Sequence, residues 1–310
     1  MSGSVPAAAE PTISVVVPTK RRLDSLGRCL EALAALDPPR GGFEVVVAND
    51  DGGAEVERVV SSFTGRMPVT VVSSVGHGPS AARNAGAAAA RGRSLAFTDD
   101  DCRPAPEWLS ALNRALESHP GAAVGGSVVN GVPDSTGAIA SQAVVDALQA
   151  IYNDRSAPRF FPSSNIAFPA APFRALGGFD ESFRYAEDRE ICARWIRSGR
   201  RFVHAPEALV AHMRALRVDH FLRQHYGYGR GAWSFRRALD RHGEKAGRPP
   251  IFAELVVQAR RRGIRSSGIA VGGYLCLAEL ATAAGYVREA VGQRLVSPRD
   301  GACDRGLRRP

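Results

Sequence analysis

The 310-residue chain is poor in cysteine, and none of its five cysteines forms a Cys-x-x-Cys pair. This scarcity excludes a disulfide scaffold and a zinc ribbon. Residues 1–11 also lack the basic start and the apolar run of a secretory signal peptide, so we expect a cytoplasmic location and a disordered N-terminus. Hydrophobic residues nevertheless make up 45% of the chain, which permits a sizeable core and excludes global disorder.

Two common nucleotide-binding signatures are also missing. The glycine-rich stretch 76–86 contains no GxxxxGK[ST] loop, and no GxGxxG follows the first predicted strand. Walker-type ATP hydrolysis and simple NAD binding are therefore disfavoured. We predict that Ser80 caps a helix that runs to Ala90. Arg83, in the first turn of that helix, then either faces an anion or is an ordinary exposed residue.

The positive charge is concentrated in one part of the chain. The net charge is +9, but residues 213–310 hold 19 basic and 8 acidic residues, which leaves 21 basic and 23 acidic residues in 1–212. A basic C-terminal third suits an anionic partner such as a phospholipid surface or a pyrophosphate-linked substrate. The acidic residues of the first part do not fit a nucleic-acid groove, and we expect no nucleic-acid partner.

The first half of the chain alternates two kinds of segment. Apolar runs typical of buried strands alternate with segments in which apolar residues recur at helical spacing, which predicts a mostly parallel sheet covered by helices. The pattern loosens after about Asn130, and a boundary near His212 is predicted. The expected strands are 13–17, 43–48, 69–72, 95–98 and 124–129, the expected helices are 23–33, 56–60, 80–90, 107–116 and 138–152, and 160–168 is expected to be extended.

Polar residues gather directly after the predicted strands. Ligands of open parallel sheets bind beyond the carboxyl ends of the strands. A single Asp at such a place is usually a cap or a turn residue, but acidic and basic clusters at successive strand ends predict a binding site. These clusters are Pro18–Arg22, Asn49–Gly52, Gly76–Asn84 and Asp99–Asp101.

The run Asp99-Asp100-Asp101 is the sharpest of these signals. Three adjacent carboxylates repel one another unless a cation is present. Mg²⁺ and Mn²⁺ prefer such oxygen ligands and keep positions open for phosphates. A solvated loop is the alternative, but the position after the apolar run 95–97 favours a metal site.

A second acidic group precedes a predicted helix. Glu187 and Asp188 lie at its start, and Gly199 ends it. First-turn acids often only complement the helix dipole. The functional alternative is that one carboxylate is a general base, and we expect the dipole to keep its pKa low.

Taken in order, these motifs resemble the family 2 glycosyltransferases, which are inverting enzymes of the GT-A fold. The resemblance covers about residues 12–230, and each motif is far less specific than the ordered set. The matching segments are Ser14–Thr19, Glu44–Gly52, Gly78–Gly86, Phe97–Asp101, Ser164–Phe168, Gly177–Glu181 and Glu187–Glu190.

The resemblance implies an α/β fold with a Rossmann-like, mostly parallel sheet flanked by helices and a helical C-terminal extension. It further implies transfer of a sugar from a nucleotide-diphosphate-sugar, a UDP-sugar first of all, to an unidentified acceptor hydroxyl. A nucleotidyltransferase acting on a sugar phosphate is the alternative. The implied divisions are a catalytic domain over 12–212, a helical basic region over 213–296 and a flexible tail over 297–310.

The resemblance also assigns roles to residues of this sequence. The general base is Asp188, and the ligands of Mg²⁺ or Mn²⁺ are Asp101 and His212, although a structural histidine is an equal alternative. The acceptor side is expected to include Asn165, Glu187 and Trp195. The donor side is expected to comprise Pro18, Thr19, Arg22, Asp50, Asp51, Arg83, Asp99 and Asp100.

The C-terminal region leaves two questions open. The aromatic and basic run 221–230 either lines the acceptor groove or packs as an amphipathic helix. Arg260–Arg262 and Arg265 precede an apolar window at 269–287, which Glu279 interrupts. A mid-helix acid disfavours a membrane span, so we expect a buried or interfacial helix in peripheral contact with a membrane. A solvated charge run beside a core helix is the alternative.

Overall fold

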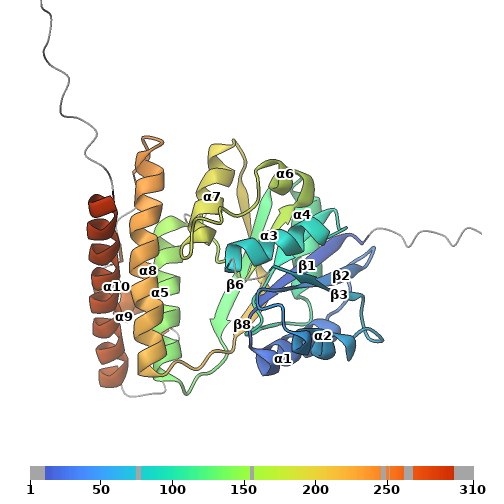
Figure 1. The fold of residues 1–310 in the computed structure, drawn as a ribbon, viewed down its shortest axis with the longest axis horizontal. Coiled ribbons are helices and arrows are strands. Elements are labelled where there is room, and N and C mark those ends of the chain that lie inside the picture. The colour runs from blue at the N-terminus through green and yellow to red at the C-terminus, as the bar shows by residue number, and fades with distance from the viewer. Residues whose placement is uncertain are drawn as a thin grey trace, which may run out of the picture.

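The structure is a computed structural model that describes residues 11–74, 78–153, 157–245, 249–250, 252–261 and 268–296. The predictions of a disordered N-terminus and a flexible tail concern residues outside these ranges, Pro11 excepted. Gly76, His77, Arg262 and Arg265 also lie outside them. Figure 1 shows a sheet with its covering helices on one side and a layer of long helices on the other.

The described residues form an eight-stranded sheet in the order β3-β2-β1-β4-β7-β6-β8-β5. Neighbouring strands among β1 to β4 are parallel, and β6 is parallel to β8, whereas β7 is antiparallel to both its neighbours and β5 is antiparallel to β8. The strands are β1 Ile13–Thr19, β2 Phe43–Asn49, β3 Val69–Ser73, β4 Ser94–Phe97, β5 Cys102–Pro104, β6 Ala123–Asn130, β7 Ile166–Pro169 and β8 Phe202–His212.

Helices cover both faces of the sheet, and a further layer of helices lies beside it. The turns between β1, β2 and β3 lead into helices as predicted, because each apolar run is followed by residues at helical spacing. The helices are α1 Leu23–Ala34, α2 Ala54–Ser61, α3 Pro79–Ala89, α4 Trp108–Ser118, α5 Thr136–Tyr152, α6 Ala170–Ala175, α7 Glu187–Arg197, α8 Val218–Asp240, α9 Phe252–Arg261 and α10 Gly268–Val296.

Three local predictions need correction. Ser80 does not cap α3, which begins at Pro79 after Gly78; the Ser80 hydroxyl instead donates to the Phe183 carbonyl over 3.2 Å. The extended segment 160–168 forms a strand only at Ile166–Pro169, because residues before it pack as irregular chain. The short strand β5 was not predicted, since its three residues carry no periodic pattern.

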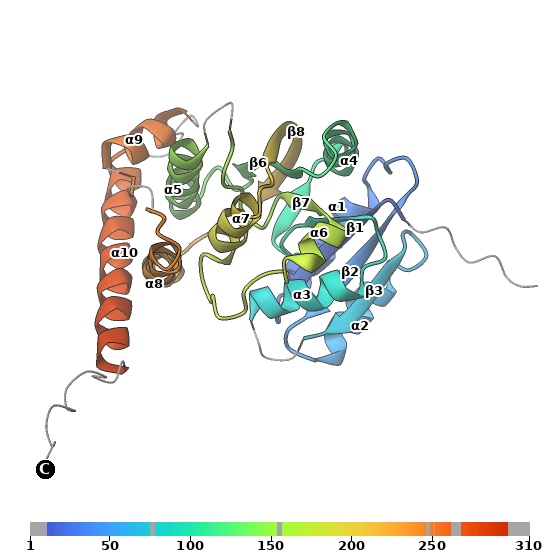
Figure 2. The same cartoon turned by 90° about the horizontal axis from the view of Figure 1, so that it is seen from above.

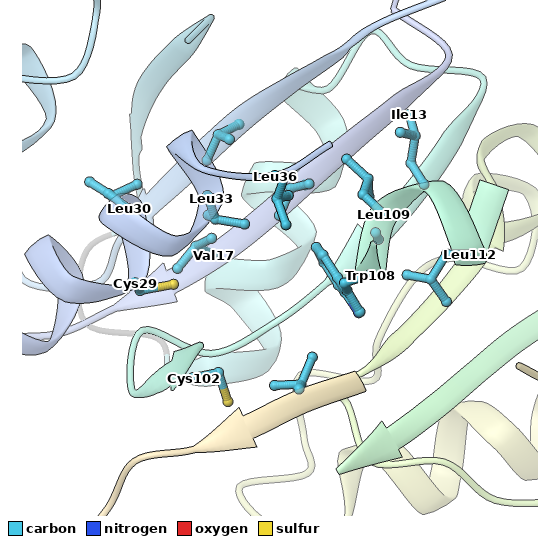
Figure 3. Packing of buried hydrophobic residues seen from close by; sticks show 14 of the residues in the cluster. Ile13, Val17, Cys29, Leu30, Leu33, Leu36, Cys102, Trp108, Leu109 and Leu112 are labelled. Carbon is cyan, nitrogen blue, oxygen red and sulfur yellow. The ribbon is translucent and has the colours of Figure 1, made fainter. Parts of the chain in front are cut away.

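Two apolar clusters hold the helices on the sheet. One joins α1, α2 and α4 to one face, and Figure 3 shows Val17 of β1, Leu30 of α1 and Trp108 of α4 converging in it. The other is aromatic and joins α6 and α7 to the opposite face through Phe97, Phe168 and further rings. Burial of large side chains on both faces fixes the sheet and therefore the edge at which its strands end.

A third cluster forms the helical layer of α5, α8, α9 and α10. The backbones of α8 and α10 approach very closely, because a Cβ on Gly229 would lie 1.9 Å from the Thr282 carbonyl oxygen, and one on Gly285 would lie 2.0 Å from that of Tyr226. Only glycine permits such an approach. Figure 2 shows α10 at the outer edge of this layer, away from the sheet.

Candidate functional site

A cavity of about 800 Å³ opens where β1, β2 and β4 end, and its far wall comes from α5, α7 and α8. This volume falls in the range of small-molecule sites. Predicted residues from widely separated parts of the chain meet in it. Those that line it are Pro18, Thr19, Arg22, Asp50, Arg83, Asp99, Asp101, Glu187, Asp188 and His212.

The end of β1 is tied to the acidic run after β4. The hydroxyl of Thr19 donates to Asp100 Oδ2 over 2.7 Å, and Arg22 forms ion pairs with both Asp100 and Asp101. Burial raises the pKa of Asp100 to about 6. Asp100 is fully buried and does not line the cavity, which corrects its expected contact with the donor: its carboxyl group holds the loop together.

Asp50 ties two further loops together. Its carboxylate accepts from Lys20 Nζ over 2.9 Å and from the Gly78 amide over 3.1 Å, so it links the end of β1 to the start of α3. Asp51 is not among the residues that line the cavity and pairs with Arg21 over 2.6 Å. Of the two aspartates expected on the donor side, only Asp50 therefore lines the cavity.

Asp101 and His212 form a close acid–imidazole pair. Antiparallel pairing of β5 with β8 sets Cys102 opposite His212, which brings His212 Nε2 within 3.3 Å of Asp101 Oδ1. Burial favours the neutral carboxyl, but the hydrogen bond and charge of His212, with the charge of Arg22, outweigh it and hold the pKa of Asp101 below its usual range.

These two side chains fit a divalent cation. One ligand atom each from Asp101, Cys102 and His212 lie within 4.8 Å of one another. Burial raises the pKa of the Cys102 thiol well above its usual value, so that sulfur stays protonated and is a poor ligand. A carboxylate and an imidazole remain, a donor set that suits Mn²⁺ or Mg²⁺ and leaves positions for phosphate oxygens.

Arg83 bridges the two acidic groups of the cavity. Its Nη2 lies 2.7 Å from Asp99 Oδ1 and its Nη1 lies 3.0 Å from Glu187 Oε1, and the side chain is only 5% exposed. Burial opposes the charge of Arg83, and the two carboxylates more than restore it, so the pKa of Arg83 is raised. The resemblance implies that Arg83 lies on the donor side, and the structure places it in the cavity wall, where its guanidinium also fixes α7 against the end of β4.

The first turn of α7 presents Glu187 and Asp188 to the cavity from a strained start. Ala186 has φ 64° and ψ 21°, a left-handed conformation that non-glycine residues rarely adopt. Burial raises the pKa of Glu187 to about 7, against the opposing charge of Arg83. Burial also raises the pKa of Asp188, so the expected low value is wrong: loss of solvent outweighs the helix dipole and the charge of Arg189.

Two residues expected on the acceptor side lie in the core instead. The amide of Asn165 accepts from Trp108 Nε1 over 2.8 Å and donates to the Ser127 carbonyl, and the residue is fully buried. Trp195 is also fully buried and donates to the Arg201 carbonyl over 3.0 Å. Both satisfy interior polar groups, so they cannot contact an acceptor.

Part of the cavity wall comes from α5 and α8, which lie outside the matching motif segments. Gln224 and Tyr228 line the cavity from α8, and Gln224 Nε2 lies 2.9 Å from Tyr228 Oη and 2.8 Å from Ser141 Oγ. Phe221 and His225, on the next face of α8, are fully buried. Within the run 221–230, Gln224 and Tyr228 thus line the cavity, whereas Phe221 and His225 pack in the interior. That this part of the cavity is the acceptor groove stays a prediction.

A model of glycosyl transferase family 2 matches residues 14–176, more than half of the chain. The chain therefore belongs to this family, and the resemblance read from the motifs is confirmed. Among curated proteins it is 29% identical over 229 residues to a pre-mycofactocin glycosyltransferase of Mycobacterium tuberculosis, covering 71% of this chain and 46% of that protein. It is 30% identical over 206 residues to a validoxylamine A glucosyltransferase of Streptomyces hygroscopicus, covering 56% and 48%. The chain thus spans about half the length of these relatives.

The fold is also found in solved structures. The mannosyltransferase PcManGT from Pyrobaculum calidifontis, in complex with GDP-Man and Mn²⁺, aligns with a TM-score of 0.59 at 21% identity over 92% of this chain and 80% of its own. A fragment of S. aureus TarS in complex with UDP aligns with a TM-score of 0.52 at 17% identity over 94% of both chains. The GT-A type fold expected from the sequence is confirmed.

Proposed function

We propose that this chain transfers a sugar from a nucleotide-diphosphate-sugar to an acceptor hydroxyl, with a bound divalent cation and with inversion at the anomeric carbon. One observation carries the proposal. Asp101 and Asp188, which come from opposite sides of the cavity, line the same space, and the Arg83 bridge between Asp99 and Glu187 holds their elements in register. Family membership favours this reaction over nucleotidyl transfer.

The donor would bind along the strand ends. Asp50, held by Lys20 and the Gly78 amide, is placed to accept hydrogen bonds from a nucleobase or ribose. Asp99 lines the cavity beside it. We take a UDP-sugar as the first candidate and a GDP-sugar as the second, since one structural neighbour contains UDP and another contains GDP-Man.

Asp101 and His212 would hold the cation between them. When bound, it would neutralise negative charge on the diphosphate leaving group. Arg214 also lines the cavity, and no hydrogen bond or ion pair engages it among the described residues. Its guanidinium is therefore available to a phosphate oxygen, a role that the sequence assigned to Arg83.

Asp188 would act as the general base. The acceptor oxygen attacks the anomeric carbon while its proton passes to the Asp188 carboxylate, and the bond from that carbon to the diphosphate oxygen breaks. One displacement of this kind inverts the anomeric configuration. A raised pKa makes Asp188 a stronger base than an exposed aspartate, provided that it is ionised.

Donor binding is tested by thermal stabilisation of the full chain with UDP- and GDP-sugars, each with Mn²⁺, with Mg²⁺ and with EDTA. We expect one nucleotide-sugar to raise Tm only when metal is present. Absence of any metal-dependent shift would contradict the proposal.

The base is tested with Asp188→Asn. We expect turnover to fall by about 10²- to 10⁴-fold with unchanged donor binding, because the amide cannot take a proton. Glu181→Gln, on an exposed residue outside the cavity, is the matched control and should retain activity. Retained turnover in Asp188→Asn would remove this residue from its role.

The division into a catalytic domain over 12–212 and a basic helical region over 213–296 stays a prediction, as does the cytoplasmic location. The peripheral membrane contact predicted for the C-terminal region also stays a prediction.

A further inference from the structure

Helix α8 contains three glycines within five residues, Gly227, Gly229 and Gly231. Glycine is unfavourable in the interior of a helix, so such a run indicates that other parts of the chain approach the helix closely. At about 100° per residue, Gly227 and Gly231 share one face of α8, and Gly229 lies on the nearly opposite face. The two faces receive different parts of the chain.

Gly229 faces α10, whereas Gly227 and Gly231 receive Tyr185 from the segment that leads into α7. A Cβ on Gly227 would lie 2.3 Å from Cε1 of the Tyr185 ring, and one on Gly231 would lie 2.9 Å from both the carbonyl carbon and the carbonyl oxygen of Tyr185. Rotation of the ring relieves the first of these contacts. The second involves backbone, so a methyl group on Gly231 has to displace the chain at Tyr185.

The chain at Tyr185 leads directly into the strained start of α7. Ala186, the next residue, has φ 64°, a conformation that persists only where the surroundings fix it. Phe183 is buried against Phe235 of α8, and its carbonyl accepts from the Ser80 hydroxyl. The segment is therefore anchored at Phe183 and at Tyr185, immediately before the residue that carries the strain.

The carboxylate of Asp188 depends on this backbone for its direction. Among the described residues, the one hydrogen bond that it accepts comes from the amide of its chain neighbour Arg189. Glu187, by contrast, is held by Arg83 over 3.0 Å. The first turn of α7, and the conformation of Ala186 before it, therefore set where Asp188 points.

We propose that Tyr185 is a positioning residue for Asp188, and that Gly227 and Gly231 form the seat on α8 that holds it. The seat fixes the backbone at Tyr185, the left-handed conformation of Ala186 is kept, and the Asp188 carboxylate stays directed into the cavity. This inference rests on the proposed role of Asp188 as general base. Gly231 does not line the cavity, so its effect on turnover is transmitted through Tyr185.

Two alanine substitutions on opposite faces of α8 test the proposal in the full chain. Gly231→Ala presses on the Tyr185 backbone, and Gly229→Ala, the matched control, presses on the Thr282 carbonyl of α10. Both should lower Tm, because both add a methyl group to a close contact. Turnover is measured well below either Tm as release of UDP from UDP-glucose and of GDP from GDP-mannose with Mn²⁺, with water as the acceptor.

The two variants should differ in kcat. We expect Gly231→Ala to lower kcat by about 10- to 100-fold with an unchanged Kd for the nucleotide-sugar, because a base moved by a fraction of an ångström or more loses its alignment while the donor side is untouched. Gly229→Ala should keep kcat within about threefold of the unaltered chain.

The Tyr185 side chain is tested with Tyr185→Ala and the conservative Tyr185→Phe. The atoms that meet the seat belong to the ring and the backbone, and no hydrogen bond engages the hydroxyl among the described residues. Tyr185→Phe should therefore retain kcat, and Tyr185→Ala should lower it as Gly231→Ala does. An equal loss in Tyr185→Phe would give the hydroxyl a direct role and overturn the proposal.

Hydrogen exchange of backbone amides gives a readout that needs no substrate. In Gly231→Ala we expect faster exchange over residues 184–192, and in Gly229→Ala faster exchange in α10 instead. If Gly231→Ala does not fold, Tyr185→Ala takes its place with the same expectation. Unchanged exchange over 184–192 would overturn the proposal.

Equal losses of kcat in Gly231→Ala and Gly229→Ala would also overturn it, since a general loss of packing would then explain both. Failure of the proposed function looks different. In that case Asp188→Asn retains turnover, or no nucleotide-sugar binds with metal, while faster exchange over 184–192 in Gly231→Ala still shows that the seat holds the start of α7.

Discussion

The two walls of the cavity are built in different ways. The wall formed by the strand ends is a network of hydrogen bonds and ion pairs, in which Thr19 and Arg22 bond to Asp100 and Asp101 across loops. The wall formed by α5, α7 and α8 depends on helix packing, and its side chains Gln224 and Tyr228 form neutral hydrogen bonds. Arg83 is the link between them, so the reactive geometry depends on one buried ion-pair bridge.

Breaking that bridge should have the largest effect. Arg83→Met removes both ion pairs and leaves Asp99 and Glu187 partly buried without a partner, so we expect a loss of about 3 kcal/mol of stability. Misplacement of α7 should lower kcat/KM by about 100-fold or more. Denaturant unfolding and steady-state kinetics measure the two effects.

The matched control is Arg66→Met, which removes an exposed ion pair with Glu31 at 2.8 Å. It should change neither quantity measurably, because solvent screens that pair. If Arg83→Met behaved like this control, the two walls would be independent of each other.

The pH dependence of turnover should reflect the titration of the acids on the wall formed by α5, α7 and α8. The carboxylate of Asp188 must be ionised to take a proton, and burial raises its pKa and that of its neighbour Glu187, the latter to about 7. We expect kcat at saturating donor to fall about tenfold per pH unit on the acid side, with a midpoint above the usual carboxyl range. A profile from about pH 5 to about pH 9 that is flat throughout would show that no such buried acid controls the rate.

Adding a side chain at the close contact of α8 and α10 should lower stability. A methyl group on Gly285 would meet the Tyr226 carbonyl oxygen at 2.0 Å, so Gly285→Ala forces α8 and α10 apart and should cost about 1–3 kcal/mol. Gly272→Ala, in the same helix with no atom within 4 Å of the added carbon, should instead stabilise the chain by up to about 1 kcal/mol. Equal effects of the two substitutions on Tm would contradict the close contact.

At pH 7 the smallest effect is expected for His225. This ring is fully buried, neither of its nitrogens has a hydrogen-bond partner among the described residues, and burial lowers its pKa to about 4. Because the folded pKa lies below the unfolded one, the unfolded state binds more protons and stability falls as the pH drops from about 6.5 toward 4, by on the order of 3 kcal/mol.

The variant His225→Leu should flatten that part of the pH profile of unfolding and retain stability at pH 7, since no partner group is left unpaired. The exposed His242→Leu is the control and should leave the profile unchanged. An unchanged slope in His225→Leu would mean that other groups govern acid sensitivity.

The two walls also differ in how far the sequence predicted them. The aspartates of 99–101 and Asp50 follow apolar runs directly, so their place at one edge of the sheet could be predicted from local pattern. Asn165 and Trp195 were misassigned, because a motif position does not show whether a side chain points to the core. Arg214 was missed as a site residue, and for Tyr228 the sequence left two alternatives open, because no short pattern shows which face of a distant helix closes a cavity.

The amino-acid sequence by itself determined the parallel half of the sheet, the acidic strand ends and the family. These properties follow from the spacing of apolar residues and from motifs within single segments. Only the tertiary structure decided that Arg83 joins two acids, that Asp188 loses solvent, and that Ile269 and Leu280 of α10 stay exposed. Ion pairing, burial and exposure depend on neighbours that are far away in the chain, and packing alone brings those neighbours together.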